Sequence, residues 1–310
     1  MLTRRRFLKG FGTLLLSGIA MGGYAFGMEP LRHRIQSYKL LPPRWPSGFR
    51  LRIAALADIH ACRPWMSPER IRYIVARTNA LRPDVIVLLG DYGGSHRWVT
   101  DWVHSTEWSK ALSGLSAPLG VHAILGNHDW WEDRAAQRRG KGPLFGQRAL
   151  EKVGINVYEN DVTRLTKDGH AVWLAGLGDQ LALPPGRRWG RKRWQGMDDL
   201  PGTLAKVSDK APVILLAHEP DIFPQVPERV SLTLAGHTHG GQVRLFGYSP
   251  VVPSRYRNRY AYGHITEASD ALPRRPRHMI VSGGLGCTGL PVRFGMPPEI
   301  VVVDLGGETA

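Results

Sequence analysis

The sequence predicts an α/β fold in which mixed sheets form a sandwich. Short apolar, β-branched runs alternate with helical patterns early in the chain, and the later sequence is richer in strands. The 310 residues, 43% of them hydrophobic, can bury a large core, and this composition is typical of globular proteins. The predicted strands are Arg50–Ala57, Val85–Leu89, Val121–Leu125, Val172–Ala175, Val213–Ala217, Leu232–Ala235, Met279–Val281 and Ile300–Val303.

The clearest helical pattern begins after Ser67, a favourable N-cap residue. Pro68 suits the first helical position, and Glu69 places a negative charge in the first turn. Residues suited to a buried helix face then recur at helical spacing: Ile71, Ile74, Val75 and Thr78. Further helices are predicted over Gly146–Val153 and Leu200–Val207, and loops over Arg187–Trp194 and Arg255–Tyr260.

The first 26 residues are typical of a targeting segment. A basic stretch precedes a Gly-rich apolar run over residues 10–26, and its arginines followed by Phe-Leu-Lys resemble a twin-arginine signal, which directs the export of folded proteins. An ordinary amphipathic first helix is the alternative. The basic residues are Arg4, Arg5, Arg6 and Lys9.

Cleavage of this segment stays open in the sequence. No Ala-x-Ala motif precedes Glu29, and the 17-residue run is at the lower limit for crossing a bilayer, so an uncleaved anchor is the second interpretation. The chain is therefore divided into a twin-arginine signal or anchor at 1–26, a Pro-containing linker at 27–48 and a globular domain at 49–310.

The charge balance and the cysteine count narrow the class of protein. The chain has 41 Lys and Arg against 26 Asp and Glu, and it remains basic without residues 1–26. The positive electrostatic field of such a chain favours an anionic partner such as a phosphate, nucleic acid or membrane surface, although basic loops can also keep a protein soluble. The two cysteines are too few for a disulfide scaffold. We expect Cys62 and Cys287 to be buried free thiols, with a disulfide between them as the alternative.

Polar residues follow the predicted strands in a regular way. Because open α/β sheets gather ligand sites beyond the carboxyl ends of their strands, we expect these groups to converge on one edge. Imidazole, carboxylate and amide donors without a thiolate suit Mn, Fe or Zn, and a metal pair can clamp both oxygens during displacement at phosphorus. The groups are Asp58-Ile59-His60, Gly90-Asp91, Gly126-Asn127-His128-Asp129, Ala217-His218-Glu219-Pro220 and Gly236-His237-Thr238-His239.

This ordered set resembles the calcineurin-like metallophosphoesterases from about Arg50 to the end of the chain. The resemblance implies a four-layer α-β-β-α sandwich of two mixed sheets, with two divalent metal ions at one edge. It also implies that a water or hydroxide held by the metals attacks phosphorus and that His128 acts as general acid. By the same resemblance, the first metal is held by Asp58, His60 and His239, the second by Asn127, His218 and His237, and Asp91 bridges the two.

One position departs from the family pattern. Many relatives carry a second Asp three residues after the bridging Asp, where it orients the catalytic His. Here that position is Gly94. Either another group orients His128, with Asp129 the nearest in sequence, or the acid is less well poised.

Within the family the chain is similar to a twin-arginine-exported bacterial branch that includes or adjoins enzymes cleaving the pyrophosphate of UDP-2,3-diacylglucosamine. The resemblance rests on Gly240-Gly241-Gln242 and on the closing segment 284–300. It implies a phosphodiesterase of lipid A or glycolipid metabolism, with a lipid-linked or UDP-sugar substrate, acting in the periplasm or at the outer face of the cytoplasmic membrane. UDP-sugars are cytosolic, so export implies another lipid phosphate, or else residues 10–26 anchor without exporting.

The partners expected are a phosphoester substrate, the twin-arginine export machinery and a membrane surface. Basic residues after residue 26 either meet anionic headgroups or belong to a solvated linker: Arg32, Arg34, Lys39 and Arg44. An exported nuclease or nucleotide phosphodiesterase is the alternative enzyme, because Arg187–Trp194 interleaves arginines with Trp189 and Trp194; export argues against a nucleic-acid partner. A non-catalytic binding scaffold is the third hypothesis, but such a protein would have lost ligands.

Overall fold

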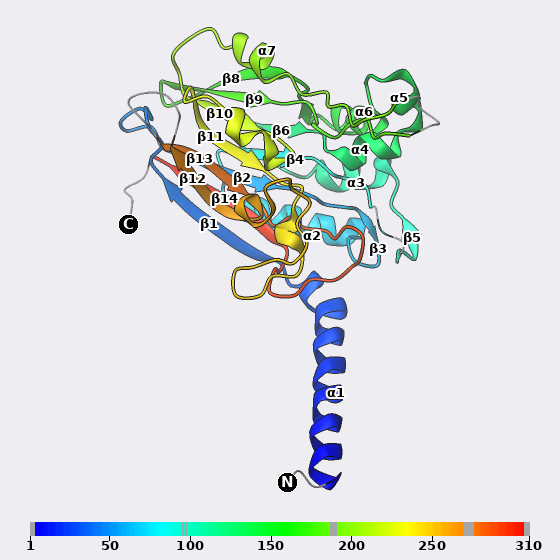
Figure 1. Ribbon diagram of the computed structural model, residues 1–310. Helices are drawn as coiled ribbons and strands as arrows, with labels where there is room; N and C mark the ends of the chain where they lie inside the picture. The colour runs from blue at the N-terminus through cyan, green and yellow to red at the C-terminus, as the bar shows by residue number, and fades with distance from the viewer. Residues whose placement is uncertain (1–3, 95, 97, 187–190, 269–275, 307–310) are drawn as a thin grey trace.

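The predicted apolar runs form the central strands of two six-stranded sheets (Figure 1). The computed structural model describes residues 4–94, 96, 98–186, 191–268 and 276–306. The first sheet has the order β1 (Arg34–Leu40), β14 (Glu299–Leu305), β2 (Leu51–Leu56), β4 (Val85–Leu89), β6 (Val121–Ile124) and β7 (Asn156–Val157). The second has the order β12 (Gly263–Ala268), β13 (Pro276–Val281), β11 (Val230–Ala235), β10 (Val213–Leu216), β9 (His170–Gly176) and β8 (Asp161–Lys167). A small ribbon pairs β3 (Cys62–Arg63) with β5 (Asp101–Trp102).

Both sheets are mixed, as the sequence predicts. In the first, β2, β4 and β6 run parallel, with Ile53 opposite Val85, while β14 runs antiparallel to β2. In the second, β9, β10, β11 and β13 run parallel, and the edge strands β8 and β12 run antiparallel to their neighbours. Since parallel strands end at the same edge, the polar groups that follow them are brought together.

Alternating side chains of the central strands fill separate cores, which fixes the layer order. On β2, Ile53 packs between the two sheets, whereas Ala54 faces the helices α2 (Pro68–Ala80), α3 (Ser105–Leu112) and α6 (Phe145–Lys152). On β10, Ile214 faces the first sheet and Val213 the outer layer with α7 (Leu200–Ala205). The order helix, sheet, sheet, helix confirms the four-layer sandwich. Two short helices, α4 (Asn127–Glu132) and α5 (Arg134–Arg139), follow β6.

The helix predicted after Ser67 is α2, and its start is built as expected. The Ser67 hydroxyl accepts a hydrogen bond from the Arg70 amide at 3.4 Å, and Pro68 occupies the first helical position. Its buried face consists of Pro68, Ile71, Ile74, Val75 and Thr78. The helices predicted over Gly146–Val153 and Leu200–Val207 correspond to α6 and α7.

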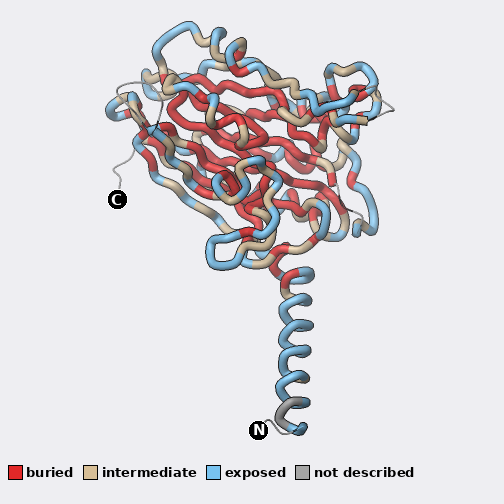
Figure 2. Tube along the Cα trace, viewed as in Figure 1, coloured by how far each residue is buried: buried red, intermediate tan, exposed pale blue. Residues whose placement is uncertain are grey.

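Residues 4–27 form a single helix, α1 (Arg4–Gly27), that projects away from the sandwich (Figure 1). Figure 2 shows that α1 is exposed along most of its length, in contrast to the buried strands. A span over Leu8–Leu31, with a mean hydropathy of 1.3, is long and apolar enough to cross a membrane, a property that signal sequences share. This accords with a signal or an anchor.

The structure corrects two expectations about loops. Residues 34–40, within the predicted linker 27–48, form β1 and pair in parallel with β14. Only alternate residues of β1 are shielded from solvent, so the sequence has no apolar run there that would have predicted a strand. In the predicted loop Arg255–Tyr260, residues Arg257–Tyr260 form a 3₁₀ helix. Part of the other predicted loop, residues 187–190, lies outside the described residues. Cys62 and Cys287 are both buried and free.

Candidate metal centre

The polar groups that follow the strands are held in a strained backbone. Twelve non-glycine residues of the described chain have positive φ, and five of them are predicted metal ligands. Non-glycine residues seldom adopt this conformation, and where they do it often marks a functional site. The five are Asp58, His60, Asp91, His237 and His239, with φ between 45° and 69°.

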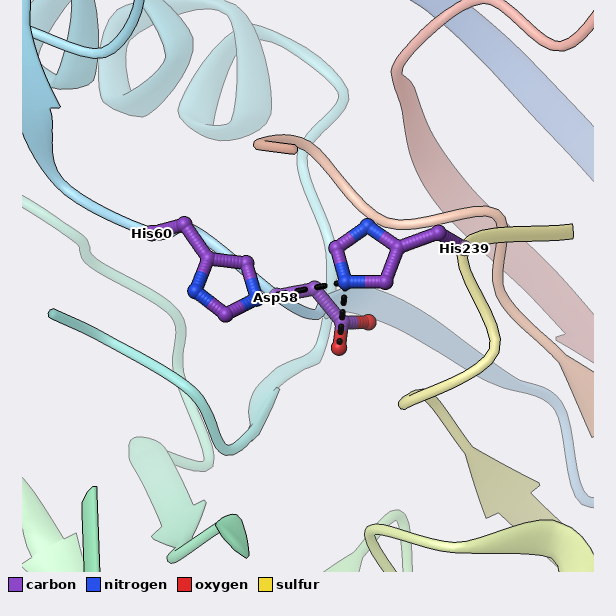
Figure 3. Close-up of side chains that lie close together, drawn as sticks. All are labelled: Asp58, His60 and His239. Carbon is purple, nitrogen blue, oxygen red and sulfur yellow. Dashed lines mark hydrogen bonds and ion pairs between the residues drawn. The ribbon is translucent and has the colours of Figure 1, made fainter. Parts of the chain in front are cut away.

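The first predicted ligand set converges from β2 and from the turn after β11 (Figure 3). The Nε2 atoms of His60 and His239 lie 3.2 Å apart, and Nε2 of His239 lies 3.5 Å from Oδ1 of Asp58. All three side chains are buried. Their ligand atoms lie within 4.8 Å of one another, close enough to share one ion.

The second predicted set lies beside the first. Oδ1 of Asn127 lies 3.1 Å from Nε2 of His218 and 2.9 Å from Nδ1 of His237. Asp91, His218 and His237 form a further group whose ligand atoms all lie within 4.8 Å of one another. The amide oxygen of Asn127 therefore faces the same point as the two imidazoles.

Asp91 connects the two sets through one oxygen. Its Oδ2 lies 3.5 Å from Nε2 of His60 and 3.3 Å from Nε2 of His218. Its Oδ1 accepts a hydrogen bond from the His128 amide at 2.9 Å. This placement between the two sets is the one that a bridging carboxylate requires.

The protonation chemistry of the first set fits a cation. Metal ligation needs neutral imidazoles and ionised carboxylates. Burial lowers the pKa of His60 to about 3 and that of His239 well below its usual range, so both rings keep a lone pair. Burial also raises the pKa of Asp58 to about 7, so this carboxylate needs a nearby positive charge to stay ionised. The distal Nδ1 of His60 lies 2.9 Å from the Gly93 carbonyl, which directs Nε2 toward the centre.

In the second set, the pKa of one histidine is raised rather than lowered. Burial opposes the positive charge of His218, but the Asp91 carboxylate outweighs it and raises the pKa of His218 well above its usual range. Nδ1 of His218 lies 2.6 Å from the Leu89 carbonyl, so the Nε2 proton faces Asp91. A cation bound here would have to displace that proton.

Asp129 serves the backbone of the site. Its carboxylate accepts hydrogen bonds from the amides of Asp91 at 2.9 Å, Tyr92 at 3.0 Å and Gly126 at 2.8 Å. Both oxygens are thereby committed to the loops that follow β4 and β6. The sequence suggested Asp129 as a group that could orient His128. In the structure, the Asp129 carboxylate instead connects these two loops through the three backbone amides.

Aromatic rings surround His128. Its ring lies 5.1 Å from that of His60, edge to face, and 4.8 Å from the tilted ring of Trp131. Trp131 in turn lies 5.4 Å from Trp194, whose side chain is 49% exposed. An aromatic row therefore leads from Trp194 at the surface through Trp131 to His128, the predicted general acid. Trp194 belongs to the described end of the predicted loop Arg187–Trp194.

Comparison with known proteins agrees with this geometry. Residues 51–241 match the family model described as calcineurin-like phosphoesterase. The chain belongs to this family. Over 98% of its length it is 32% identical to the metallophosphoesterase YkuE of Bacillus subtilis, of which 98% is covered. It is 29% identical to the phosphodiesterase YaeI of Escherichia coli, covering 98% of this chain and 100% of that one. It is also 30% identical to a zebrafish (Danio rerio) transmembrane protein with metallophosphoesterase domain, covering 82% of this chain and 53% of that one.

Two features of this phosphoesterase were missed in the sequence. Asp179 follows β9 just as Asp91 follows β4, and it forms a third buried group with Glu219 and His218. Burial and the nearby Glu219 raise the pKa of Asp179 well above its usual range. The fully buried Arg293 lies in the closing segment, where it donates to the Gly286 carbonyl and places Nη2 3.4 Å from Nδ1 of His239. The strand-end position of Asp179 was a usable signal, whereas nothing in the sequence marks Arg293 as buried.

Proposed function

We propose that this phosphoesterase hydrolyses a phosphodiester or pyrophosphate with two divalent metal ions held by the seven predicted ligands. The observation that carries the proposal is the position of Asp91 Oδ2 between His60 and His218. When bound, two ions would activate water and neutralise charge on the phosphoryl oxygens. Mn, Fe or Zn fit a donor set of imidazole, carboxylate and amide oxygen.

In this proposal the chain's own residues position the ions and supply a proton. His128 would donate a proton to the leaving oxygen, and its backbone amide fixes Asp91 through the 2.9 Å hydrogen bond. Burial lowers the pKa of His128, and a phosphate anion beside the ring would oppose that shift. Trp131 restricts the ring from one side and His60 from another. The name of the E. coli relative, a phosphodiesterase, supports a diester rather than a monoester.

We also propose that α1 holds the domain outside the cytoplasm. Ala25 and Glu29 are buried against the domain, so any cleavage compatible with this packing would fall before Tyr24. Arg4 and Arg5, at the far end of α1, are the kind of charge that stays cytoplasmic. If the twin-arginine machinery recognises this segment, changing Arg4, Arg5 and Arg6 to lysine should leave the protein in the cytoplasm, which cell fractionation would show. Unchanged export would refute the twin-arginine signal but would leave the proposed enzyme activity standing.

A lipid-linked phosphoester is our leading substrate class, because the candidate membrane helix joins the catalytic domain directly. A nucleotide phosphodiesterase is the second candidate, favoured by the aromatic row from Trp194 to His128, on which a base could stack. Retention of all seven predicted ligands speaks against a non-catalytic scaffold.

A hydrolysis screen tests the function. The metal-loaded protein would be offered lipid, sugar-nucleotide and nucleotide phosphodiesters, with Asp91→Asn as the inactive control. Turnover confined to lipid or glycolipid esters supports the leading class, and turnover confined to nucleotides supports the second. No turnover of any ester by the metal-loaded protein would contradict the proposed reaction.

A further inference from the structure

From Gly10 to Gly27, α1 carries no charged side chain. Large apolar side chains between residues 8 and 21 are more than half exposed: Leu8, Phe11, Leu14, Leu15, Leu16, Ile19 and Met21. Such an exposed apolar surface is more stable in lipid than in water. Its 24 residues span about 36 Å, enough for a hydrocarbon core of about 30 Å.

The domain end of α1 is firmly attached to the sandwich. The Arg293 amide donates to the Ala25 carbonyl at 2.9 Å, and the ring of Phe26 meets that of Trp65 edge to face at 5.3 Å. The buried Glu29 accepts a hydrogen bond from the Met296 amide at 2.7 Å. The orientation of the domain relative to α1 is therefore fixed, and the surface beside this junction would face the bilayer that α1 enters.

An exposed apolar cluster lies at this junction, on the loops after β11 and before β14, at the end of the sandwich from which α1 leaves (Figure 1). The Arg244 amide donates to the Phe294 carbonyl at 2.8 Å, and the ring of Phe294 contacts that of Tyr24 on α1 at 6.3 Å. Gln242 donates to the Leu290 carbonyl at 3.0 Å and so joins the two loops. We call the cluster the apolar patch; it consists of Leu245, Phe246, Tyr248, Val251 and Leu290, which are 47% to 108% exposed.

The turn at the tip of the patch combines a strained backbone with an exposed aromatic ring, an arrangement that is unfavourable in water. Leu245 and Tyr248 exchange backbone hydrogen bonds of 2.8 and 2.9 Å around a two-residue turn. Phe246 and Gly247 at its centre have φ of 50° and 80°, values that favour Asn-Gly rather than a bulky residue. Phe246 therefore accepts backbone strain while its side chain, 108% exposed, projects away from the described part of the domain. A lipid environment would give this ring a favourable place.

A cavity of about 490 Å³ adjoins the same junction. Its lining includes Tyr24 at the end of α1 and Phe294 from the closing segment. The charged residues of the lining are Arg32, Arg34 and the buried Glu29. Arg32 is exposed, whereas Arg34 pairs with Glu299 at 3.1 Å. The exposed Arg32 therefore supplies a positive charge beside the apolar patch, and such a charge suits an anionic membrane surface.

We propose that the apolar patch and this cavity form a membrane-docking face that rests on an anionic bilayer beside α1. The loop that carries the patch contacts the turn beside the metal centre, because the Ser249 hydroxyl donates to the Gly240 carbonyl at 2.6 Å, one residue after His239. Docking would thus hold at the lipid surface the loop that contacts the turn carrying His239. The docking face itself does not depend on which ester the site hydrolyses.

The test places a fluorescent label at the tip of the patch. Full-length Phe246→Cys would be labelled with an environment-sensitive dye and reconstituted in vesicles of phosphatidylglycerol and phosphatidylethanolamine. Thr166→Cys, an exposed site on β8 at the opposite side of the sandwich, is the matched control. The buried Cys62 and Cys287 should leave the unsubstituted protein largely unlabelled.

We expect the label at 246 to shift to the blue in vesicles, to be quenched by spin-labelled lipid, and to be several-fold less sensitive to aqueous iodide than the label at 166. Full access of iodide to both labels would overturn the docking face, because α1 would then be only a tether. Equal protection at both positions would overturn it too, because it would indicate adsorption without orientation. None of these three readouts requires enzymatic activity.

Discussion

Oδ2 of Asp91 lies 3.3 Å from Nε2 of His218, and the same oxygen lies 3.5 Å from Nε2 of His60. The oxygen that faces one ligand set therefore faces the other as well. A single substitution here should affect both sets, whereas a substitution elsewhere should affect one. This asymmetry makes the two-metal hypothesis testable residue by residue.

Asp91→Asn should lose both ions and all measurable turnover, because the bridging charge disappears. Asp58→Ala should lose one ion preferentially, since the candidate ligand atoms that Asp58 groups with are those of His60 and His239, while it contacts His237 of the other set through the backbone amide. Elemental analysis of both purified variants, with circular dichroism as the control for folding, measures this difference. If the two variants lose metal equally, the bridging role of Asp91 is wrong.

His128→Asn should separate two classes of substrate. A nitrophenolate leaves without a proton, whereas an alkoxide needs one, so losing the acid should cost about 10²–10⁴-fold on alkyl diesters and far less on aryl diesters. Metal content should be unchanged, because the predicted ligands are other residues. The measurement is kcat/KM for both substrates in both proteins. Equal losses would assign His128 to metal or substrate binding.

Asp129→Ala should destabilise the fold. Three buried backbone amides would lose their acceptor, those of Asp91, Tyr92 and Gly126, and each such loss costs about 1–3 kcal/mol. We expect the free energy of unfolding to fall by at least about 2 kcal/mol in denaturant titrations, and metal affinity to fall with it. A variant of normal stability with a defect confined to alkyl diesters would instead make Asp129 the residue that orients His128.

Gly90→Ala should be much more damaging than an alanine at another glycine with positive φ. A Cβ at Gly90 would lie 2.6 Å from the Gly126 amide nitrogen and 2.8 Å from Nδ1 of His218. Gly169, in the turn between β8 and β9, has φ of 78°, and a Cβ there would meet no heavy atom of the described residues within 4 Å. Gly169→Ala should therefore cost only about 1–2 kcal/mol. Thermal unfolding and metal content of both variants test this. Similar behaviour of the two would mean that the β4 turn tolerates displacement.

The strands that the sequence predicted are the central ones of both sheets, and the strands that it missed are the edges. A central strand such as β4 is buried on both faces and reads as a continuous apolar run. Edge strands β1, β8 and β12 alternate between shielded and exposed residues, and β7 has two residues, so none carries such a run.

The predicted ligands meet because each follows a central strand, and parallel strands end at one edge. What surrounds them was less accessible to sequence reasoning. Trp131 reaches His128 through the short helix α4, and Arg293 reaches His239 from a segment 54 residues later in the chain. Such contacts depend on how loops fold back, which local patterns do not encode.

Metal stoichiometry set against activity tests the central claim most directly. The full-length protein would be stripped with a chelator and reloaded stepwise, with bound metal per chain and turnover of a diester measured on each sample. We predict that turnover rises with loading and reaches its maximum at two ions per chain, with protons released as the site of Asp91 and His218 fills. Full activity in the metal-free protein, or a maximum at one ion per chain, would contradict a centre bridged by Asp91.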